Sequence, residues 1–333
     1  MIKNTLISII IPVYNAACYL KRCLDSLAQQ TSCQLQVILV NDASTDNTLQ
    51  IVYAFKELAA SLSNISDVHI ISHQENKGVA CSRNIGLDAA RGEYIYFLDA
   101  DDYLADHALD LMLQRALADR ADLVGCDWNL CLKQSHRVIR QPRVQSSNQA
   151  IEFMAKGVMR WNLWLFLIRR DLFERDNIRF IDGQNMGEDM LVIFKLFSCS
   201  KNISQIHEPL YYYNAINSES LTKTYLDKHR AEIQQNLYAL ECYLKKQKPH
   251  LYTDELLNYL KLNIKLPLLI SSSYKQYEIW NNWLLTPTAY CTSNNVVSFR
   301  IKCLQYMAKK KQYWFLKLHY YLLVKLIYGI IYK

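Results

Sequence analysis

The chain has 333 residues, of which 51% are hydrophobic and 21% are charged, and its formal net charge is +7. This composition suits a globular protein of about two domains and excludes a disordered or collagen-like chain. Glycine and proline are scarce, and no internal repeat or low-complexity linker is found.

The cysteines and the N-terminus both predict a reducing compartment. The ten cysteines include no CxxC pair and no Cys/His cluster at zinc spacing, so we expect reduced, mostly buried thiols. The first apolar run, residues 6–11, leads into Pro12 without a basic region or a cleavage site. We therefore expect a cytosolic protein.

The N-terminal part of the chain alternates between predicted strands and helices. Continuous apolar runs indicate strands that are buried on both faces, and apolar residues at helical spacing separate them. This alternation predicts an α/β fold with a Rossmann-like, mostly parallel sheet flanked by helices and joined by right-handed crossovers. The predicted strands are 6–11, 35–40, 68–71, 94–98 and 122–126, and the predicted helices are 16–29, 45–62, 79–90 and 105–118.

The strand–helix rhythm stops after residue 126, and residues 137–149 are polar and irregular. From about residue 226 the pattern is mainly helical. We therefore predict one domain over 1–225, made of a first half (1–120) and a second half (121–225), followed by a helical C-terminal region over 226–333.

One apolar strand, 94–98, ends in three carboxylates, Asp99, Asp101 and Asp102. An isolated ionised carboxylate in an apolar medium is very costly, so we expect these side chains to meet solvent or a cation. In open α/β sheets, ligands bind outside the carboxyl ends of the strands, which predicts a hard metal ion and a phosphate here. The alternative is a turn followed by a helix N-cap.

The ends of the first two predicted strands lack the usual glycine-rich phosphate loops. Neither Gly-x-Gly-x-x-Gly nor Gly-Lys-Ser/Thr follows the first strand, which disfavours a dehydrogenase and a P-loop nucleotidase. Instead Tyr14 follows the first strand and Asp42 the second. An aspartate could accept the imide N–H of uracil while a tyrosine ring stacks on the base, although Asp42 taken alone is better interpreted as a helix cap.

Four motifs in sequence order resemble the inverting nucleotide-diphospho-sugar glycosyltransferases of family 2, which have the GT-A fold. The resemblance is close over about residues 5–105 and looser over 150–222. It implies a bacterial enzyme that builds cell-surface glycans. The motifs are Ile9–Asn15, Val40–Thr48, Asn76–Leu87 and Phe97–Asp102, the last of which matches the DxD motif of the family.

The resemblance implies a nucleotide-sugar site at these strand ends. Asp42 would bind the base, Asp99 would lie near the ribose, and Asp101 would hold Mg²⁺ or Mn²⁺ on the diphosphate. For Arg83 a salt bridge to a neighbouring acid is an equally good interpretation. The residues expected to bind the nucleotide sugar are Pro12, Tyr14, Asp42, Lys77, Arg83 and Asp99.

The sequence Gly187-Glu188-Asp189 resembles the pair of acids that opens the acceptor-side helix in the family. The resemblance implies that Asp189 is the general base that deprotonates the acceptor hydroxyl. The alternative is that both acids only favour the start of a helix through its dipole.

Aromatic residues are frequent in the second half of the predicted domain. We expect Trp164 to lie in the core, whereas Trp161 could stack on a sugar ring. The segments Tyr211–Tyr213 and Ser218–Thr222 resemble a family stretch to which we assign no role.

The C-terminal tail, residues 299–333, is basic and aromatic, because no acidic residue follows Glu278. Lys317 and Lys325 interrupt its apolar runs, so it cannot span a bilayer. On a helical wheel the lysines gather on one half, and Trp314, Phe315, Leu318, Leu322 and Ile330 lie mostly outside it. The tail therefore predicts a helix on an anionic membrane surface rather than a nucleic-acid-binding arm. The alternative is a helix packed on the catalytic domain with a solvated basic face.

Together these features predict a metal-dependent inverting glycosyltransferase that moves a hexose or an N-acetylhexosamine from a UDP-linked donor. We expect the acceptor to be a glycan or lipid-linked glycan of cell-surface polysaccharide or lipooligosaccharide biosynthesis, and the enzyme to lie at the inner face of the cell membrane. A non-catalytic membrane-surface protein with the same fold is the alternative. A sugar-phosphate nucleotidyltransferase is disfavoured, because no glycine-rich basic loop follows the first strand.

Overall fold

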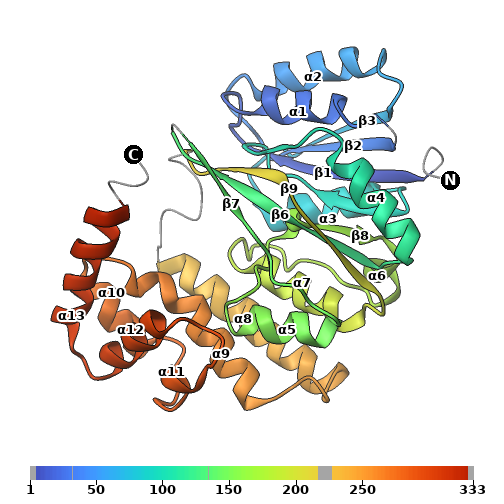
Figure 1. Cartoon of the computed structure of the whole chain (residues 1–333). Coiled ribbons are helices and arrows are strands. Elements are labelled where there is room, and N and C mark those ends of the chain that lie inside the picture. The colour runs from blue at the N-terminus through green and yellow to red at the C-terminus, as the bar shows by residue number, and fades with distance from the viewer. Residues whose placement is uncertain (1–4, 32, 134, 217–226, 329–333) are drawn as a thin grey trace. The chain divides into compact units, whose positions relative to one another are not determined.

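The computed structural model describes residues 5–31, 33–133, 135–216 and 227–328 (Figure 1). The chain divides into two compact units. The first, which we call the sheet unit, comprises Met1–Leu132, His136–Ser147 and Trp161–Leu240, and the second, the helical unit, comprises Lys133–Ser135, Asn148–Arg160 and Glu241–Lys333. The predicted domain boundary at residue 225 stays a prediction.

Over its described residues, the sheet unit contains a nine-stranded sheet in the order β3-β2-β1-β4-β8-β6-β9-β5, with β7 paired to β6. The α/β fold class is confirmed, but the sheet is mixed rather than mostly parallel. Strands β1 to β4 and the β6–β9 pair are parallel, whereas β8, β7 and β5 join their neighbours antiparallel. The strands are β1 Leu6–Val13, β2 Gln34–Asn41, β3 Ile65–Ser72, β4 Tyr94–Phe97, β5 Tyr103–Leu104, β6 Leu123–Cys131, β7 His136–Ile139, β8 Phe166–Arg169 and β9 Ile203–Asn214.

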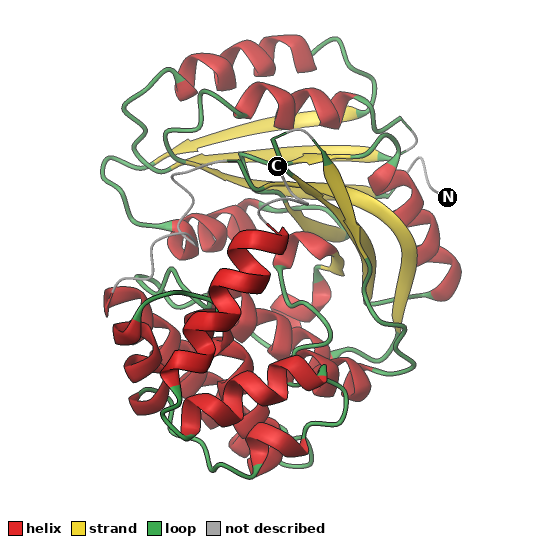
Figure 2. Cartoon of the chain, turned by 60° about the vertical axis from the view of Figure 1, so that its left-hand side comes forward, coloured by secondary structure: helices red, strands yellow, loops and turns green. Residues whose placement is uncertain are grey.

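Helices cover both faces of this sheet (Figures 1 and 2). Helices α1 (Leu20–Ala28) and α2 (Thr48–Ala59) lie side by side on one face, and α3 (Val79–Ala89) packs under β1 and β2 on the other. Right-handed crossovers require this change of face, because the strand order runs from β1 to β3 and then reverses to β4. The reversal makes the carboxyl ends of β1 and β4 a topological switch point, where ligands bind in open α/β sheets.

The predicted strands of the N-terminal part match the observed ones closely, but three helices begin three or four residues later than predicted, at Leu20, Thr48 and Ala108. Residues before α1 and α2 form loop contacts instead of a first helical turn. The Ala16 backbone N–H donates to Thr48 Oγ1 at 2.8 Å, and the Ala17 N–H donates to Asp46 Oδ2 at 3.1 Å. These bonds join the loops that follow β1 and β2.

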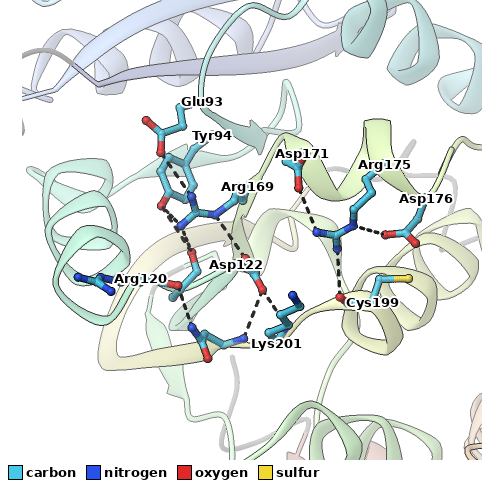
Figure 3. A network of polar contacts seen from close by, with 12 residues as sticks. Glu93, Tyr94, Arg120, Asp122, Arg169, Asp171, Arg175, Asp176, Cys199 and Lys201 are labelled. Carbon is cyan, nitrogen blue, oxygen red and sulfur yellow. Dashed lines mark hydrogen bonds and ion pairs between the residues drawn. The ribbon is translucent and has the colours of Figure 1, made fainter.

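A polar network joins the amino end of β4 to β8 and to the segment before β9 (Figure 3). Arg169 Nη2 donates to Tyr94 Oη at 3.0 Å, and its guanidinium forms ion pairs with Glu93 at 3.5 Å and Asp122 at 3.3 Å. Asp122 Oδ2 also accepts the backbone N–H of Lys201 at 2.7 Å. The network lies at the end of β4 opposite the carboxylates, so it supports the sheet and takes no part in the site.

The remaining elements of the sheet unit position the second half of the site. They are α4 Ala108–Asp119, η2 Leu163–Leu165, α6 Asp171–Arg175 and α7 Glu188–Cys199, and two further helices, α5 Ser147–Ala155 and α8 Asp227–Gln247, extend from this unit into the helical one.

The helical unit is otherwise built from α9 Asp254–Lys265, η4 Leu266–Leu269, α10 Tyr274–Asn282, α11 Tyr290–Ser293, α12 Phe299–Lys309, α13 Tyr313–His319 and the π-helix η5 Tyr320–Tyr328 (Figure 2). Its core contains a fully buried lysine, Lys265, whose Nζ donates to the carbonyl oxygens of Trp283 at 3.3 Å and Leu284 at 3.0 Å. Burial, with the nearby charge of Lys309, lowers the pKa of Lys265 to about 7. Within the described ranges, no helix has both the length and the hydropathy that crossing a membrane requires.

Candidate active site

The loops after β1 and β2 hold an exposed tyrosine at the edge of the switch point. Asn15, in the left-handed region with φ 46°, accepts the Thr45 backbone N–H at 2.8 Å through Oδ1, and its own N–H donates to Ser44 Oγ at 3.0 Å. Pro12 is half-buried within β1, whereas Tyr14 is 51% exposed. The bonded loops therefore present the Tyr14 ring to solvent, where it can stack on a flat ligand.

Asp42, at the carboxyl end of β2, is buried and holds the loop that follows β3. Its Oδ1 accepts from His73 Nδ1 at 2.8 Å and from the Lys77 N–H at 2.7 Å, and its Oδ2 accepts the Gly78 N–H at 2.8 Å. A carboxylate accepts about four hydrogen bonds, so one position remains for a ligand. We did not predict the role of His73, although its place after the strand paired with β2 could have indicated it. The Lys77 side chain is exposed.

Gly78 allows Asn185, in the loop before α7, to lie against the start of α3. Its φ is +86°, and a Cβ at this position would lie 2.2 Å from Asn185 Nδ2. Asn185 Oδ1 accepts the Ala80 N–H at 3.1 Å. Only glycine combines this conformation with so close an approach, so residue 78 joins the two halves of the site.

The three acids after β4 differ in their surroundings. Asp99 and Asp101 are half-buried, but Asp102 is 1% exposed and accepts Tyr211 Oη and the Asn214 N–H, both at 2.6 Å. The expectation that all three meet solvent or a cation is therefore wrong for Asp102, because two hydrogen-bond donors from β9 satisfy it. Burial and the neighbouring carboxylates raise the pKa of Asp102 well above its usual range.

Arg83, on α3, is 3% exposed and lies between the acids of the two halves. Its Nη2 contacts Asp99 Oδ1 at 3.1 Å, and its Nη1 contacts Glu188 Oε1 and Asp189 Oδ1, each at 2.8 Å. Burial alone would lower the pKa of Arg83, but these three carboxylates raise it. Of the two interpretations of Arg83, the structure contains the salt bridge, and the nucleotide contact stays a prediction.

Asp189 lies in the first turn of α7, two residues after Gly187, whose φ is 77°. Its Oδ1 pairs with Arg83, and its Oδ2 accepts the Leu163 N–H at 3.2 Å. A general base must lie within hydrogen-bond reach of the hydroxyl group whose proton it takes. Asp189 is partly exposed, so a hydroxyl group can reach it.

The aromatic residues of the second half mainly build the core around these acids. Trp164 is buried and stacks on Tyr211 with ring centroids 4.2 Å apart, as predicted for a core residue. Trp161 is half-buried against Phe194 at 6.1 Å. The segment Ser218–Thr222 lies outside the described residues.

The acids after β4 fit a metal ion that a ligand helps to coordinate. In the part of the chain that the structure describes, no group of three or more His, Cys, Asp and Glu side chains could hold a metal ion alone. Mg²⁺, however, is usually bound by one or two carboxylates together with substrate phosphates. Burial and the charges of Asp101 and Asp189 raise the pKa of Asp99 to about 6 against the effect of Arg83, and a divalent cation would relieve this accumulation of charge.

A doubly wound sheet with paired acids at its switch point and a further acid opening the facing helix defines a glycosyltransferase of the GT-A type. The family model described as Glycosyl transferase family 2 matches residues 8–191, a span that contains every predicted site residue. The chain belongs to this family, which confirms the resemblance seen in its motifs.

Two curated relatives illustrate the match. The glycosyltransferase EpsJ of Bacillus subtilis (strain 168) is 32% identical over 241 residues, which cover 67% of this chain and 66% of EpsJ. The chain thus spans just under two thirds of the length of that relative. Chondroitin synthase of Pasteurella multocida (strain Pm70) is 42% identical over 115 residues, which cover 34% of this chain and 11% of that protein.

Solved structures share the fold over nearly the whole chain. TarS residues 1–349 of S. aureus, in complex with UDP-GlcNAc, superposes with a TM-score of 0.67 at 19% identity and covers 95% of this chain and 91% of its own. The GT-A fold with a helical C-terminal region is therefore confirmed.

Proposed function

We propose that this protein is a metal-dependent, inverting glycosyltransferase that moves a hexose or an N-acetylhexosamine from a UDP-linked donor to a cell-surface glycan. One observation carries the proposal: Asp99, on the donor side, and Asp189, on the acceptor side, are held by the same buried arginine. An inverting transfer needs a leaving-group site and a general base on opposite sides of one sugar, and a shared arginine between a donor-side and an acceptor-side acid supports such an arrangement.

In this proposal the donor binds at the switch point of the sheet. The Tyr14 ring stacks on the base, the remaining acceptor position of Asp42 takes a base N–H, and Pro12 and Lys77 border the nucleotide. Asp99 binds the ribose, and Asp101 holds Mg²⁺ or Mn²⁺, which when bound offsets the charge that develops on the diphosphate. Asp189 takes the proton of the acceptor hydroxyl as its oxygen attacks the anomeric carbon.

The ligands bound to structurally similar proteins support the donor class. TarS has been crystallised with UDP-GlcNAc and with UDP. A mannosyltransferase of Pyrobaculum calidifontis, with a TM-score of 0.51, contains GDP-Man and Mn²⁺. Chondroitin synthase and hyaluronan synthase of Pasteurella multocida are each 42% identical to this chain over 115 residues. These proteins favour a nucleotide sugar, a divalent cation and a polysaccharide product.

A panel of nucleotide sugars tests the proposal without knowledge of the acceptor. We expect purified protein with Mn²⁺ to hydrolyse one donor slowly and to release its nucleoside diphosphate, because water can replace the acceptor hydroxyl. Removing the cation with a chelator should abolish the release, and adding Mn²⁺ or Mg²⁺ back should restore it. If no donor in the panel releases its nucleoside diphosphate and calorimetry detects no nucleotide binding, the non-catalytic alternative is the one that remains.

We also propose that the enzyme works at the inner face of the cell membrane on a glycan or lipid-linked glycan acceptor, and that the C-terminal helix binds anionic lipid. Every fourth residue from Trp314 to Leu326 is exposed, namely Trp314 (59%), Leu318 (48%), Leu322 (50%) and Leu326 (56%). Leu316 and His319 are buried on the other face. The π-helix has more residues per turn than an α-helix, so residues four apart stay closer to one face.

The charge around this apolar stripe fits an anionic surface. Lys310, Lys311 and Lys325 are exposed, and no acidic residue follows Glu278 in the chain. A lysine near an anionic membrane contributes about 1 kcal/mol of attraction. Of the other residues placed on the apolar side of the wheel, Phe315 is half-buried, and Ile330 lies outside the described residues.

Sedimentation with vesicles checks the membrane proposal. We expect binding to phosphatidylglycerol vesicles that weakens in high salt, little binding to phosphatidylcholine, and loss of binding when Trp314, Leu318 and Leu322 are changed to serine. The matched control changes Ile270, Leu285 and Val296, which are also exposed apolar residues of the helical unit, to serine. Equal binding by both triple variants would refute the proposed surface.

A further inference from the structure

Three carboxylates occupy both terminal nitrogens of the Arg83 guanidinium. Its Nη1 is shared by two carboxylates and its Nη2 is used by a third, while the Phe180 ring lies 5.7 Å from Cζ. Nε is buried without a hydrogen-bond partner among the described atoms. Because a guanidinium is planar, burial and hydrogen bonds at two of its nitrogens hold it in one orientation. The guanidinium in turn fixes the orientation of the carboxylates that are bonded to it.

Asp189 receives its orientation from this contact. Arg83 Nη1 binds its Oδ1 at 2.8 Å, whereas the Leu163 backbone N–H donates to its Oδ2 at the longer distance of 3.2 Å. The proton of an acceptor hydroxyl would therefore go to Oδ2, whose second lone pair is the better placed to receive it.

Glu188 contacts the same guanidinium nitrogen as Asp189. It is buried beside Asp189 and shares the same Nη1 at the same distance, 2.8 Å, so the guanidinium is not devoted to Asp189 alone. Burial and the Asp189 carboxylate raise the pKa of Glu188 to about 8 against the effect of Arg83. Glutamine has nearly the same shape as glutamate and can accept a hydrogen bond from Nη1 through its amide oxygen.

We propose that Arg83 and Glu188 are positioning residues: Arg83 fixes the Asp189 carboxylate so that Oδ2 faces the acceptor, and Glu188 accepts from Nη1 to hold the guanidinium in that orientation. This inference rests on the proposed function, because it assumes that Asp189 is the base. It differs from a nucleotide-binding role for Arg83, in which the guanidinium would contact the diphosphate directly.

Two measurements on the donor found in the panel separate these roles: the turnover of donor hydrolysis and the affinity for UDP by calorimetry. For Arg83→Lys we expect turnover to fall about 100-fold, the effect of misplacing a catalytic group by about 1 Å. UDP affinity should fall much less than turnover, because of the three acids that Arg83 contacts only Asp99 is assigned to the nucleotide. The control is Arg169→Lys, another arginine that pairs with two acids but at the opposite end of β4, and it should keep wild-type turnover. A matching loss of UDP affinity in Arg83→Lys would overturn the inference, and so would unchanged turnover.

A second pair of variants tests the inference even if Arg83→Lys does not fold. Glu188→Gln keeps an oxygen that can accept from Nη1, so we expect turnover within about 3-fold of wild type, whereas Glu188→Ala should lose about 10-fold. Equal turnover in the two variants would refute the positioning role of Glu188. A wild-type chain that hydrolyses no donor would instead refute the proposed function, and the inference with it.

Discussion

Asp101→Asn should lose donor hydrolysis by about 1,000-fold or more while the protein keeps its fold. A metal ion on the diphosphate contributes several kcal/mol of charge stabilisation in the transition state, and an amide is a much weaker ligand for a hard cation than a carboxylate. The charge of Asp101 also helps to raise the pKa of Asp99 and of Asp102. Removing it therefore relieves repulsion, and thermal unfolding should show an equal or higher Tm.

Calorimetry provides a readout that does not depend on turnover. Wild-type protein should bind UDP more tightly with Mn²⁺ than with chelator, and Asp101→Asn should show no such difference. Asp106→Asn is the matched control, because Asp106 follows in the same segment but is exposed. Metal-dependent binding that survives in Asp101→Asn would contradict the assignment.

This variant also separates the enzyme from the non-catalytic alternative. A protein that only keeps the fold has no need of repulsive acids at a strand end. In that case Asp101→Asn would raise stability without any loss of function. A gain in Tm together with a loss of hydrolysis supports the enzyme.

Asp189→Asn should lower the turnover of donor hydrolysis about 100- to 10,000-fold, the usual contribution of a general base, with UDP affinity unchanged. Asparagine can keep an oxygen towards Arg83 and still cannot accept a proton at neutral pH. The loss should therefore lie in turnover and not in binding or folding.

The control for this variant is Asp171→Asn. Asp171 also lies in the first turn of a helix and pairs with an arginine, Arg175 at 3.1 Å, but it is outside the site. It should keep wild-type turnover. If both variants lose activity equally, the effect of Asp189→Asn reflects the helix start and not a general base.

Several features could be read directly from the sequence because they are local. Apolar runs buried on both faces indicate parallel strands, and polar residues at their carboxyl ends mark the ligand side of the sheet. The strands 6–11, 35–40 and 94–98 were therefore predicted nearly as they occur, and the family followed from the motifs at their ends. The antiparallel partners β5, β7 and β8 were missed, since short strands depend on neighbours that are distant in the chain.

The same limit applies to single side chains. Asp102 looked like its neighbours in the sequence, but Tyr211, which is 109 residues away, buries and satisfies it. Arg83 allowed two interpretations because its partners Glu188 and Asp189 lie 105 and 106 residues further along the chain.

The sequence by itself determined the family, the sheet that carries the site and the identities of the candidate acids, because these depend on short runs and their order. The tertiary structure decided which of these acids contact Arg83. Arg83 on α3 reaches Glu188 and Asp189 on α7 because Asn185 lies close to Gly78, which places the start of α7 beside α3. Such contacts depend on packing between distant segments, where a few ångströms decide whether an arginine meets one carboxylate or three.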